Sequence, residues 1–396
     1  MTCKILHSVY RYLPAMGGVE DYVRNLAERH ATKHEVSVVC TDVANHFSGE
    51  RLENVSRDEE LASVSITRCG LSPFKIKSYP TSLDLFKTLW KKDCDVVHAH
   101  SFMYPSGDYA ALKALFQKKP LVFNPYLANE GSPSFFGRVY RKTMGELLMR
   151  ADCVVVISPF ERILLEKWGY GNVKRIEEIP PGIDLLEFEA IDYNAFETFG
   201  VYNPKKILCA GRLDPNKGLD VAIDALALMI KDNFDLSLTI VGPNFGYQSE
   251  LEKQVKRLNL GEYVHFLGPV SREDLCSLYK HATVFAFPTH YEAFGIVAAE
   301  AMAAETPVVA TRTASLPYVV KDEETGFLFE KDNPKDLANK IAVLLENEEL
   351  CRRMGASGRA HVAASYNWDR AAAKLEEIYL LLGGNAPLSK GSTLRK

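Results

Sequence analysis

Two carboxylates flank a glycine turn in the stretch HYEAFGIVAAEAMAA, residues 290–304. Apolar runs typical of buried strands lie on both sides of it, so the stretch is predicted to be the loop and helix of a β-α-β crossover. If Glu292 and Glu300 share one helix, about 12 Å of rise and roughly 80° of rotation separate them. Glycosidase carboxyl groups lie roughly 5–9.5 Å apart. This pair is therefore expected to contact two ends of one elongated ligand, unless one glutamate only complements the helix dipole and the other is a surface residue.

The residues between the two glutamates suggest an anion site. Phe294, Gly295, Ile296 and Val297 form the predicted turn into the helix. A glycine lets the backbone approach a ligand closely, and the first N–H groups of a helix bind anions. The alternative is a tight turn with no ligand.

Two cations follow another predicted strand, in AGRLDPNKGLD. Arg212 offers a bidentate fork and Lys217 a point charge, which together suit a phosphate group. The alternative is a pair of solvated loop cations.

The first half of the chain has its own candidates. Gly17 and Gly18 follow the first predicted strand and form a phosphate-tolerant turn, although G-x-G-x-x-G, the dinucleotide fingerprint, is absent. His98 and His100 end the strand in DVVHAHSF, and alternation sends both side chains to one face. Such histidines act as general bases or ligand donors, or are simply buried imidazoles with satisfied hydrogen bonds.

Composition favours a globular chain of two domains. The 396 residues are 47% hydrophobic and 25% charged, and the net charge of −4 does not favour a nucleic-acid partner. Eight scattered cysteines without a C-x-x-C pair predict neither a disulfide framework nor a zinc site. The N-terminus lacks the apolar core of a signal peptide. The expected compartment is the cytoplasm.

Strands and helices alternate in two successive series, which is typical of doubly wound parallel sheets. A segment with a Pro-Pro-Gly turn, IPPGIDLLEFEAIDY, separates the two series and suggests a linker. The predicted domains are residues 1–180 and 181–365. The tail, residues 384–396, is expected to be disordered.

Taken together, the motifs resemble those of a known family. The GG turn, HAHSF, SPFERILLEKWG, GRLDPNKG, PTHYEAFGIVAAEAMA and the closing YNWDRAAAKLEEIY occur in the order found in retaining glycosyltransferases of the family 4 type. The resemblance covers nearly all of residues 4–382. It implies the GT-B fold, with two Rossmann-like domains facing across a cleft, the first on the acceptor side and completed by a C-terminal helix at about 366–383.

The resemblance also implies roles for the candidate residues. Glu292 would contact the sugar hydroxyls, Glu300 the ribose hydroxyls, and the amides from Phe294 to Val297 the sugar and diphosphate. The remaining matches are Arg212 and Lys217 with the diphosphate, Gly17 and Gly18 with a loop that closes on the donor, His100 with the anomeric carbon, and the backbone from Gly268 to Val270 with the base. Tyr126 stands where the family often has histidine.

The implied reaction moves a hexosyl group from a nucleoside-diphosphate sugar to an acceptor hydroxyl, with retained configuration. Arg212, Lys217 and helix N–H groups would stabilise the leaving diphosphate, so neither a metal nor a cofactor is expected. His100 and Glu292 are the other expected catalytic residues. Alternatives are a nucleotide-sugar epimerase, a glycogen-phosphorylase-like enzyme, and a non-catalytic protein that binds nucleotide-sugars.

One basic segment suggests where the acceptor comes from. Residues 74–142 hold 11 Lys and Arg against 5 Asp and Glu. Within it, Leu83, Phe86, Leu89 and Trp90 recur at helical spacing, and Arg138, Arg141 and Lys142 are predicted to share a helix face. Basic amphipathic surfaces bind anionic membranes or phosphate-bearing lipids. We therefore expect peripheral attachment to the inner membrane face and a lipid-linked or polysaccharide-precursor acceptor, unless the helix simply packs its apolar face on the core.

Overall fold

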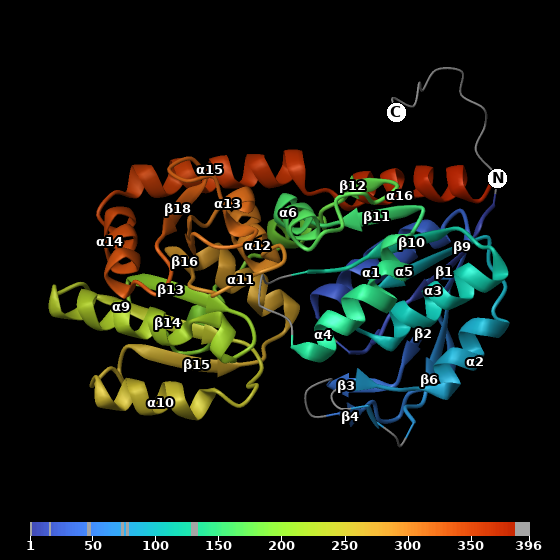
Figure 1. Ribbon diagram of the computed structural model, residues 1–396. Coiled ribbons are helices and arrows are strands. Elements are labelled where there is room, and N and C mark those ends of the chain that lie inside the picture. The colour runs from blue at the N-terminus through green and yellow to red at the C-terminus, as the bar shows by residue number, and fades with distance from the viewer. Residues whose placement is uncertain are drawn as a thin grey trace. The chain divides into compact units, whose positions relative to one another are not determined.

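The computed structural model describes residues 2–15, 17–45, 49–72, 75–76, 79–127 and 134–384. The chain divides into two compact units, one formed by Met1–Pro181 with Trp368–Lys396 and the other by Gly182–Asn367. Each unit has its own largely parallel sheet with helices on both faces (Figure 1), which confirms the predicted α/β doubly wound class. Residues 385–396, most of the tail expected to be disordered, lie outside the described residues. Among the described helices, none has the length and apolar composition of a membrane span.

The second unit is built on a six-stranded parallel sheet with the spatial order β15-β14-β13-β16-β17-β18. This is the order of a Rossmann sheet, in which the chain starts at the centre, builds one half and then returns to build the other. The strands are β13 (Lys205–Ala210), β14 (Leu236–Val241), β15 (Val264–Gly268), β16 (Val284–Phe287), β17 (Val308–Thr311) and β18 (Gly326–Phe329).

Helices cover both faces of this sheet because its strands are apolar on both sides. Three long helices pack on one face, and α11, α12 and α15 lie on the other (Figure 1). The first three are α9 (Leu219–Lys231), α10 (Gln248–Arg257) and α14 (Pro334–Leu345), and the others are α11 (Arg272–His281), α12 (Ile296–Ala303) and α15 (Glu348–Ser365). Shorter elements are α7 (Leu186–Glu189), α8 (Ala195–Thr198), the 3₁₀ turn η2 (Pro215–Lys217) and α13 (Leu316–Val319). Helix α7 lies inside the expected linker and buries Phe188.

The first unit has an eight-stranded sheet in the order β12-β11-β10-β9-β1-β2-β6-β5, parallel except for the edge strand β5. Its strands are β1 (Lys4–Ser8), β2 (Glu35–Thr41), β5 (Asp58–Leu61), β6 (Val64–Cys69), β9 (Val96–His100), β10 (Leu121–Asn124), β11 (Cys153–Val156) and β12 (Ile176–Glu178). Two small ladders join β3 (Val43–Asn45) to β4 (Glu50–Arg51) and β7 (Lys75–Ile76) to β8 (Tyr79–Pro80).

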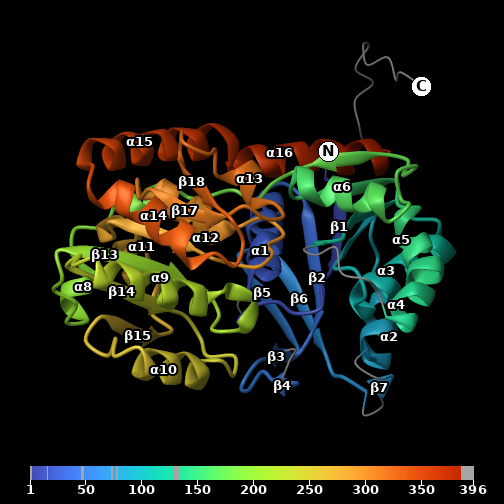
Figure 2. The ribbon, with the colours of Figure 1, turned by 60° about the vertical axis from the view of Figure 1, so that its left-hand side comes forward.

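The helices of the first unit also form two layers. Most of them gather on one side of the sheet, as Figure 2 shows for α2 to α5, while α1 and α16 pack together on the other. Their bounds are α2 (Leu83–Lys91), α3 (Pro105–Gln117), α4 (Phe135–Tyr140), the π-helical turn η1 (Arg141–Gly145), α5 (Glu146–Met149), α6 (Pro159–Lys167), α1 (Gly18–Ala31) and α16 (Trp368–Leu382). Helix α16 is fastened by a hydrogen bond of 2.9 Å between His30 Nε2 and the Ala372 carbonyl oxygen.

Candidate active site

The strand order of the second unit selects one position for a ligand. β13 and β16 are parallel neighbours in the sheet, and between them the direction in which successive strands are added to the sheet reverses. Open α/β sheets bind ligands outside the carboxyl ends of the strands at such a switch point, because the two following loops diverge and leave a crevice. The loop after β13 carries Arg212 and Lys217, and the loop after β16 carries Glu292 and Gly295. Four predicted site residues therefore meet at the switch point.

Backbone contacts hold these two loops together. The His290 N–H donates to the Asn216 carbonyl oxygen at 2.8 Å, and Asn216 Nδ2 donates to the Tyr291 carbonyl oxygen at 3.1 Å. Gly218 has a φ of 60° and lies so close to the Pro288 carbonyl oxygen that any side chain would clash with it. A glycine is therefore needed at position 218 for Lys217 to lie against the second loop.

Lys217 and Glu292 form an ion pair. Lys217 Nζ lies 2.6 Å from Glu292 Oε2, and their side chains are 14% and 23% exposed. Partial burial strengthens this pair relative to a surface ion pair, since less water screens it. The structure thereby brings together two residues that the sequence placed in different motifs.

The turn after Glu292 leads into the N-terminus of helix α12. Gly295 has a φ of 104°, and a methyl group built on it would lie 2.7 Å from Leu316 Cδ2. Ser315 Oγ, fully buried, lies 2.8 Å from the carbonyl oxygens of both Glu292 and Phe294, so its single proton can be donated to either. These contacts fix the turn so that the first N–H groups of α12, at Ile296 and Val297, face away from the helix body.

The two glutamates do not share a helix. Helix α12 begins at Ile296, so Glu292 belongs to the loop and the separation calculated for one helix does not apply. Glu300 lies on α12, 8% exposed, where it accepts from Arg272 Nη1 at 2.5 Å and from the Tyr279 hydroxyl at 3.1 Å. Sequence reasoning did not find Arg272, Tyr279 or Ser315. The sequence feature that could have identified Arg272 and Tyr279 is their i, i+7 spacing in REDLCSLY, which places both on one face of α11.

The other second-unit candidates border the same sheet edge. Arg212 Nη2 lies 3.2 Å from Asp214 Oδ2, and its guanidinium lies 5.2 Å from the Phe245 ring. Gly268, with a φ of 69°, ends β15, and Val270 precedes the Ser271 cap of α11. These positions follow β13 and β15 at their carboxyl ends.

The predicted glycine turn of the first unit is occupied by a side chain. Glu20 packs against Gly17 and pairs with Arg11, whose Nη2 lies 2.7 Å from Glu20 Oε1. Gly18 begins α1. An anion reaching this turn would meet a carboxylate, so the donor contact of Gly17 and Gly18 remains a prediction.

His100 lies inside a fully buried cluster. Its Nδ1 is 2.9 Å from the Tyr126 hydroxyl and its Nε2 is 3.0 Å from His7 Nδ1. Burial holds the pKa values of His7 and His100 well below the ordinary range, so both rings are neutral at pH 7. A buried ring touches a ligand only if the residues over it move. The contact of His100 with a donor sugar therefore stays a prediction.

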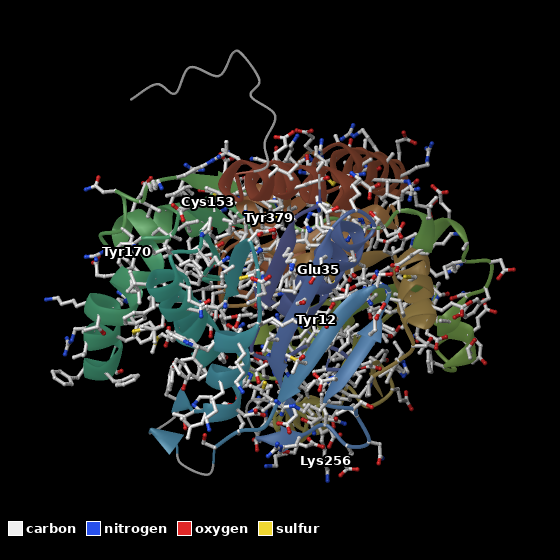
Figure 3. All side chains as sticks on the ribbon, turned by 90° about the vertical axis from the view of Figure 1, so that its right-hand side faces the viewer. Tyr12, Glu35, Cys153, Tyr170, Lys256 and Tyr379 are labelled. Carbon is white, nitrogen blue, oxygen red and sulfur yellow. The ribbon has the colours of Figure 1, made fainter. Side chains whose placement is uncertain are left out.

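Three histidines of this cluster have the mutual distances of metal ligands. The rings of His7, His98 and His100 each offer a nitrogen within 4.8 Å of the others. Asn124 Nδ2 donates to the Val155 carbonyl, so Asn124 Oδ1 must accept from His98 Nε2 at 2.6 Å. His98 Nδ1 then accepts from Tyr379, labelled in Figure 3, also at 2.6 Å. With both nitrogens of His98 engaged, a three-histidine metal site would require breaking a buried hydrogen bond.

The basic segment of the first unit differs from its prediction. Leu89 turns into the core with Leu85, which leaves Leu83 and Trp90 exposed on α2. Arg141 starts the π-helical turn, and its guanidinium lies 3.5 Å from the Trp168 ring, so it does not share a face with Arg138 and Lys142.

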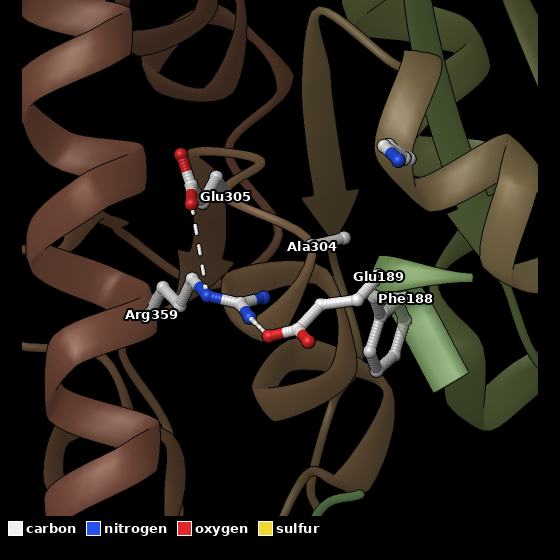
Figure 4. Close-up of a pocket in the computed structure, with 6 residues that line it drawn as sticks. Phe188, Glu189, Ala304, Glu305 and Arg359 are labelled. Atoms are coloured by element: carbon white, nitrogen blue, oxygen red, sulfur yellow. Dashed lines mark hydrogen bonds and ion pairs between the residues drawn. The ribbon is translucent and has the colours of Figure 1, made fainter. Parts of the chain in front are cut away.

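A cavity of about 390 Å³ lies elsewhere in the second unit (Figure 4). It is lined by Phe188, Glu189, Lys280, Ala304, Glu305 and Arg359. Ala304 and Glu305 follow the C-terminal end of α12, whereas the switch point is at its N-terminal end. The cavity is therefore separate from the candidate site.

Comparison with known proteins agrees with this arrangement. A family model described as glycosyltransferase family 4 matches residues 16–186, and one described as glycosyl transferases group 1 matches residues 195–361. A D-inositol 3-phosphate glycosyltransferase of Streptomyces scabiei is 32% identical over 305 residues, which cover 72% of this chain and 67% of the relative. The Corynebacterium diphtheriae protein of that name is 28% identical over 92% of this chain and 89% of its own length.

Solved structures show the same fold. Anabaena HepE in complex with UDP and glucose superposes with a TM-score of 0.78 at 22% identity, covering 95% of this chain and 99% of HepE. The sucrose-phosphate synthase of Thermosynechococcus elongatus has a TM-score of 0.76 at 24% identity, with 98% and 100% covered. These likenesses establish the GT-B fold. With both family models matched, the chain belongs to the group 1 glycosyltransferases.

Proposed function

We propose that this glycosyltransferase moves a hexosyl group from a nucleoside-diphosphate sugar to an acceptor hydroxyl, with retention of the anomeric configuration. The observation that carries the proposal is the Lys217–Glu292 pair at the switch point, beside the open N-terminus of α12. A cation, a carboxylate and free backbone N–H groups in one place match the diphosphate and the sugar hydroxyls of such a donor.

In the proposed reaction, the bond between the anomeric carbon and the diphosphate oxygen breaks as the acceptor oxygen bonds to the same face of that carbon. The acceptor proton passes to the departing diphosphate. Lys217, Arg212 and the N–H groups of α12 stabilise the negative charge that grows on the leaving group, and Glu292 holds the sugar through its hydroxyls. No residue is assigned as a covalent nucleophile.

In this proposal, Arg212, Lys217 and the N-terminus of α12 supply the positive charge that balances the diphosphate. The reaction is therefore proposed to need no metal. Excess EDTA is expected to leave turnover within about twofold of the untreated enzyme. Loss of turnover on chelation, restored by magnesium, would contradict this part of the proposal.

We propose a uridine nucleotide as the first donor to test, because HepE was solved with UDP and UDP-glucose. A thermal-shift panel of UDP-, GDP- and ADP-sugars identifies the nucleotide. Release of free nucleoside diphosphate that depends on acceptor supports a transferase, whereas an epimerase converts the donor without acceptor. A phosphorylase-like enzyme would show bound pyridoxal absorbance, and a non-catalytic protein would bind without turnover.

For the acceptor we propose a phosphate-bearing or lipid-linked molecule. The relatives named D-inositol 3-phosphate glycosyltransferase make inositol phosphate one arm of the acceptor panel. The other arm follows from two exposed stripes on the first unit. The α2 stripe holds Leu83, Lys87, Trp90 and Lys91, and the α4–η1 stripe holds Phe135, Arg138 and Val139 on α4 with Lys142 on η1. Each combines two apolar and two basic side chains on one helical face, the pattern of a surface that rests on an anionic membrane.

Sedimentation with phosphatidylglycerol vesicles at low and high salt tests the membrane arm. The wild type is expected to sediment at low salt and to be released at high salt, since salt screens the attraction. R138E with K142E should reduce sedimentation strongly. K253E with K256E, which reverses two exposed lysines of α10, should leave it unchanged. If wild-type protein stays in the supernatant at low salt, a soluble phosphate-bearing acceptor is favoured.

A further inference from the structure

Arg272 joins two carboxylates that come from different elements of the second unit. Its Nη1 donates to Glu300 Oε1 on α12 at 2.5 Å. Its Nε and Nη2 donate to Glu187 Oε2 on α7 at 2.9 and 2.6 Å. The guanidinium also lies 5.8 Å from the Phe188 ring. As the first residue of α11, after the Ser271 cap, Arg272 has a fixed backbone from which to hold both partners.

Glu300 depends on α11 for its orientation. The carboxylate lies on a fully apolar stretch of α12, where its neighbours Ala298, Ala299, Ala301 and Met302 are all fully buried. Burying a carboxylate in such surroundings is costly unless a cation and hydrogen bonds compensate it. Arg272 supplies the cation to one oxygen, and the fully buried Tyr279 donates its hydroxyl to the other. The two donors thus fix the plane of the carboxylate.

We infer that Arg272 is a positioning residue, which holds the Glu300 carboxylate in the orientation that accepts the ribose hydroxyls of the donor nucleotide. The inference rests on the proposed function and on the ribose contact that the family resemblance implies for Glu300. The competing explanation is that Arg272 only fastens α7 through Glu187. The two explanations differ in whether replacing Arg272 weakens specifically the binding of the ribose hydroxyls.

Titration calorimetry with nucleotides that differ only in the ribose hydroxyls separates them. UDP, GDP and ADP are each compared with the 2′,3′-dideoxy form, and the tightest pair is used. A hydrogen bond to a charged group is worth roughly tenfold or more in affinity, so wild-type protein should prefer the natural nucleotide by at least about tenfold. In R272M, whose side chain still covers Phe188, the preference should fall below about threefold.

Glu187→Gln is the matched control, because it removes the α7 carboxylate and leaves the Arg272–Glu300 contact intact. It is expected to keep the wild-type preference. If R272M does not fold, as judged by circular dichroism, R272Q replaces it with the same expectation, since the shorter, uncharged glutamine side chain does not reproduce the Arg272 contact with Glu300.

The outcomes are distinguishable. Wild-type protein that binds none of the three nucleotides overturns the proposed function itself. Binding without preference for the ribose hydroxyls overturns the role of Glu300. A tenfold preference that survives in R272M or R272Q, or that is lost equally in E187Q, overturns the role of Arg272. Loss of preference in the Arg272 variants alone supports it.

Discussion

Lys217 Nζ and Glu292 Oε2 lie 2.6 Å apart although 75 residues separate them in the chain. They meet because β13 and β16 are neighbours in the sheet, so the loops that follow them reach the same edge. Each residue therefore compensates the charge of the other. A bound donor would take over both partners, the diphosphate for the lysine and the sugar hydroxyls for the glutamate.

Replacing the cations of the switch point should slow the reaction more than it weakens folding. Lys217→Ala and Arg212→Ala are each expected to lower kcat by roughly 100- to 1000-fold, the usual effect of removing one group that stabilises charge in the transition state. Steady-state kinetics with the preferred donor measures this. Lys253→Ala, at an exposed pair with Glu250, is the control and should leave kcat unchanged. A kcat within threefold of wild type for Lys217→Ala would exclude Lys217 from leaving-group stabilisation.

Replacing Glu300 should affect nucleotide binding most. Glu300→Ala removes an acceptor of charge-assisted hydrogen bonds, so donor binding should weaken by roughly 1.5–3 kcal/mol. Calorimetry with the nucleoside diphosphate is the measurement, and circular dichroism verifies the fold. Glu305→Ala, an exposed carboxylate just beyond α12, should bind like wild type. Unchanged affinity in a folded Glu300 variant would remove the ribose contact from the proposal.

Two glycines with similar backbone angles separate strain from crowding. Gly295 has a φ of 104° and Gly246 a φ of 93°, but only Gly295 has neighbours that an added methyl group would meet. Gly246→Ala should cost about 1–2 kcal/mol in unfolding free energy from backbone strain alone. Gly295→Ala should cost more and should also displace the N-terminus of α12, so that donor affinity falls. Equal losses of stability, with donor binding intact in both, would show that the turn does not hold the ligand.

His30 should contribute a loss of stability to the first unit in mild acid. Burial lowers the pKa of His30 to about 4, against about 6.5 in an unfolded chain. Between these values the unfolded state binds more protons, so the unfolding free energy falls as the pH drops from about 6.5 to 4, by roughly 3 kcal/mol for this group.

Urea titrations across that pH range measure the effect. His30→Gln, which keeps a donor for the Ala372 carbonyl, should flatten the decline. Glu161 acts in the opposite direction, because burial raises the pKa of its carboxyl to about 7 and the folded state then holds the extra proton. A variant His30→Gln with an undiminished acid decline would exclude His30 as a contributor.

Sequence patterns were sufficient for the sheets and for the loops that meet at the switch point of the second unit. Runs such as CVVV and VFAF are continuous and apolar because strands covered by helices on both faces have no polar side, so their type and order could be predicted. The same rule, that ligands gather at the carboxyl ends of parallel strands, located the loops that carry Arg212, Lys217 and Glu292.

The tertiary structure decided which of these residues contact one another and which side chains hold them in place. Glu300 contacts Arg272 and Tyr279, and Ser315 forms hydrogen bonds with the Glu292 turn. These contacts join residues from different elements, and local periodicity carries no information about such partners. Local periodicity also gives no sign of three other contacts. These are the pairing of Glu20 with Arg11 beside Gly17, the burial of the His100 ring, and the contact of Arg141 with the Trp168 ring. A sequence determines which face of an element is apolar, but the identity of the side chain that packs against each polar group follows only once the strands have taken their spatial order.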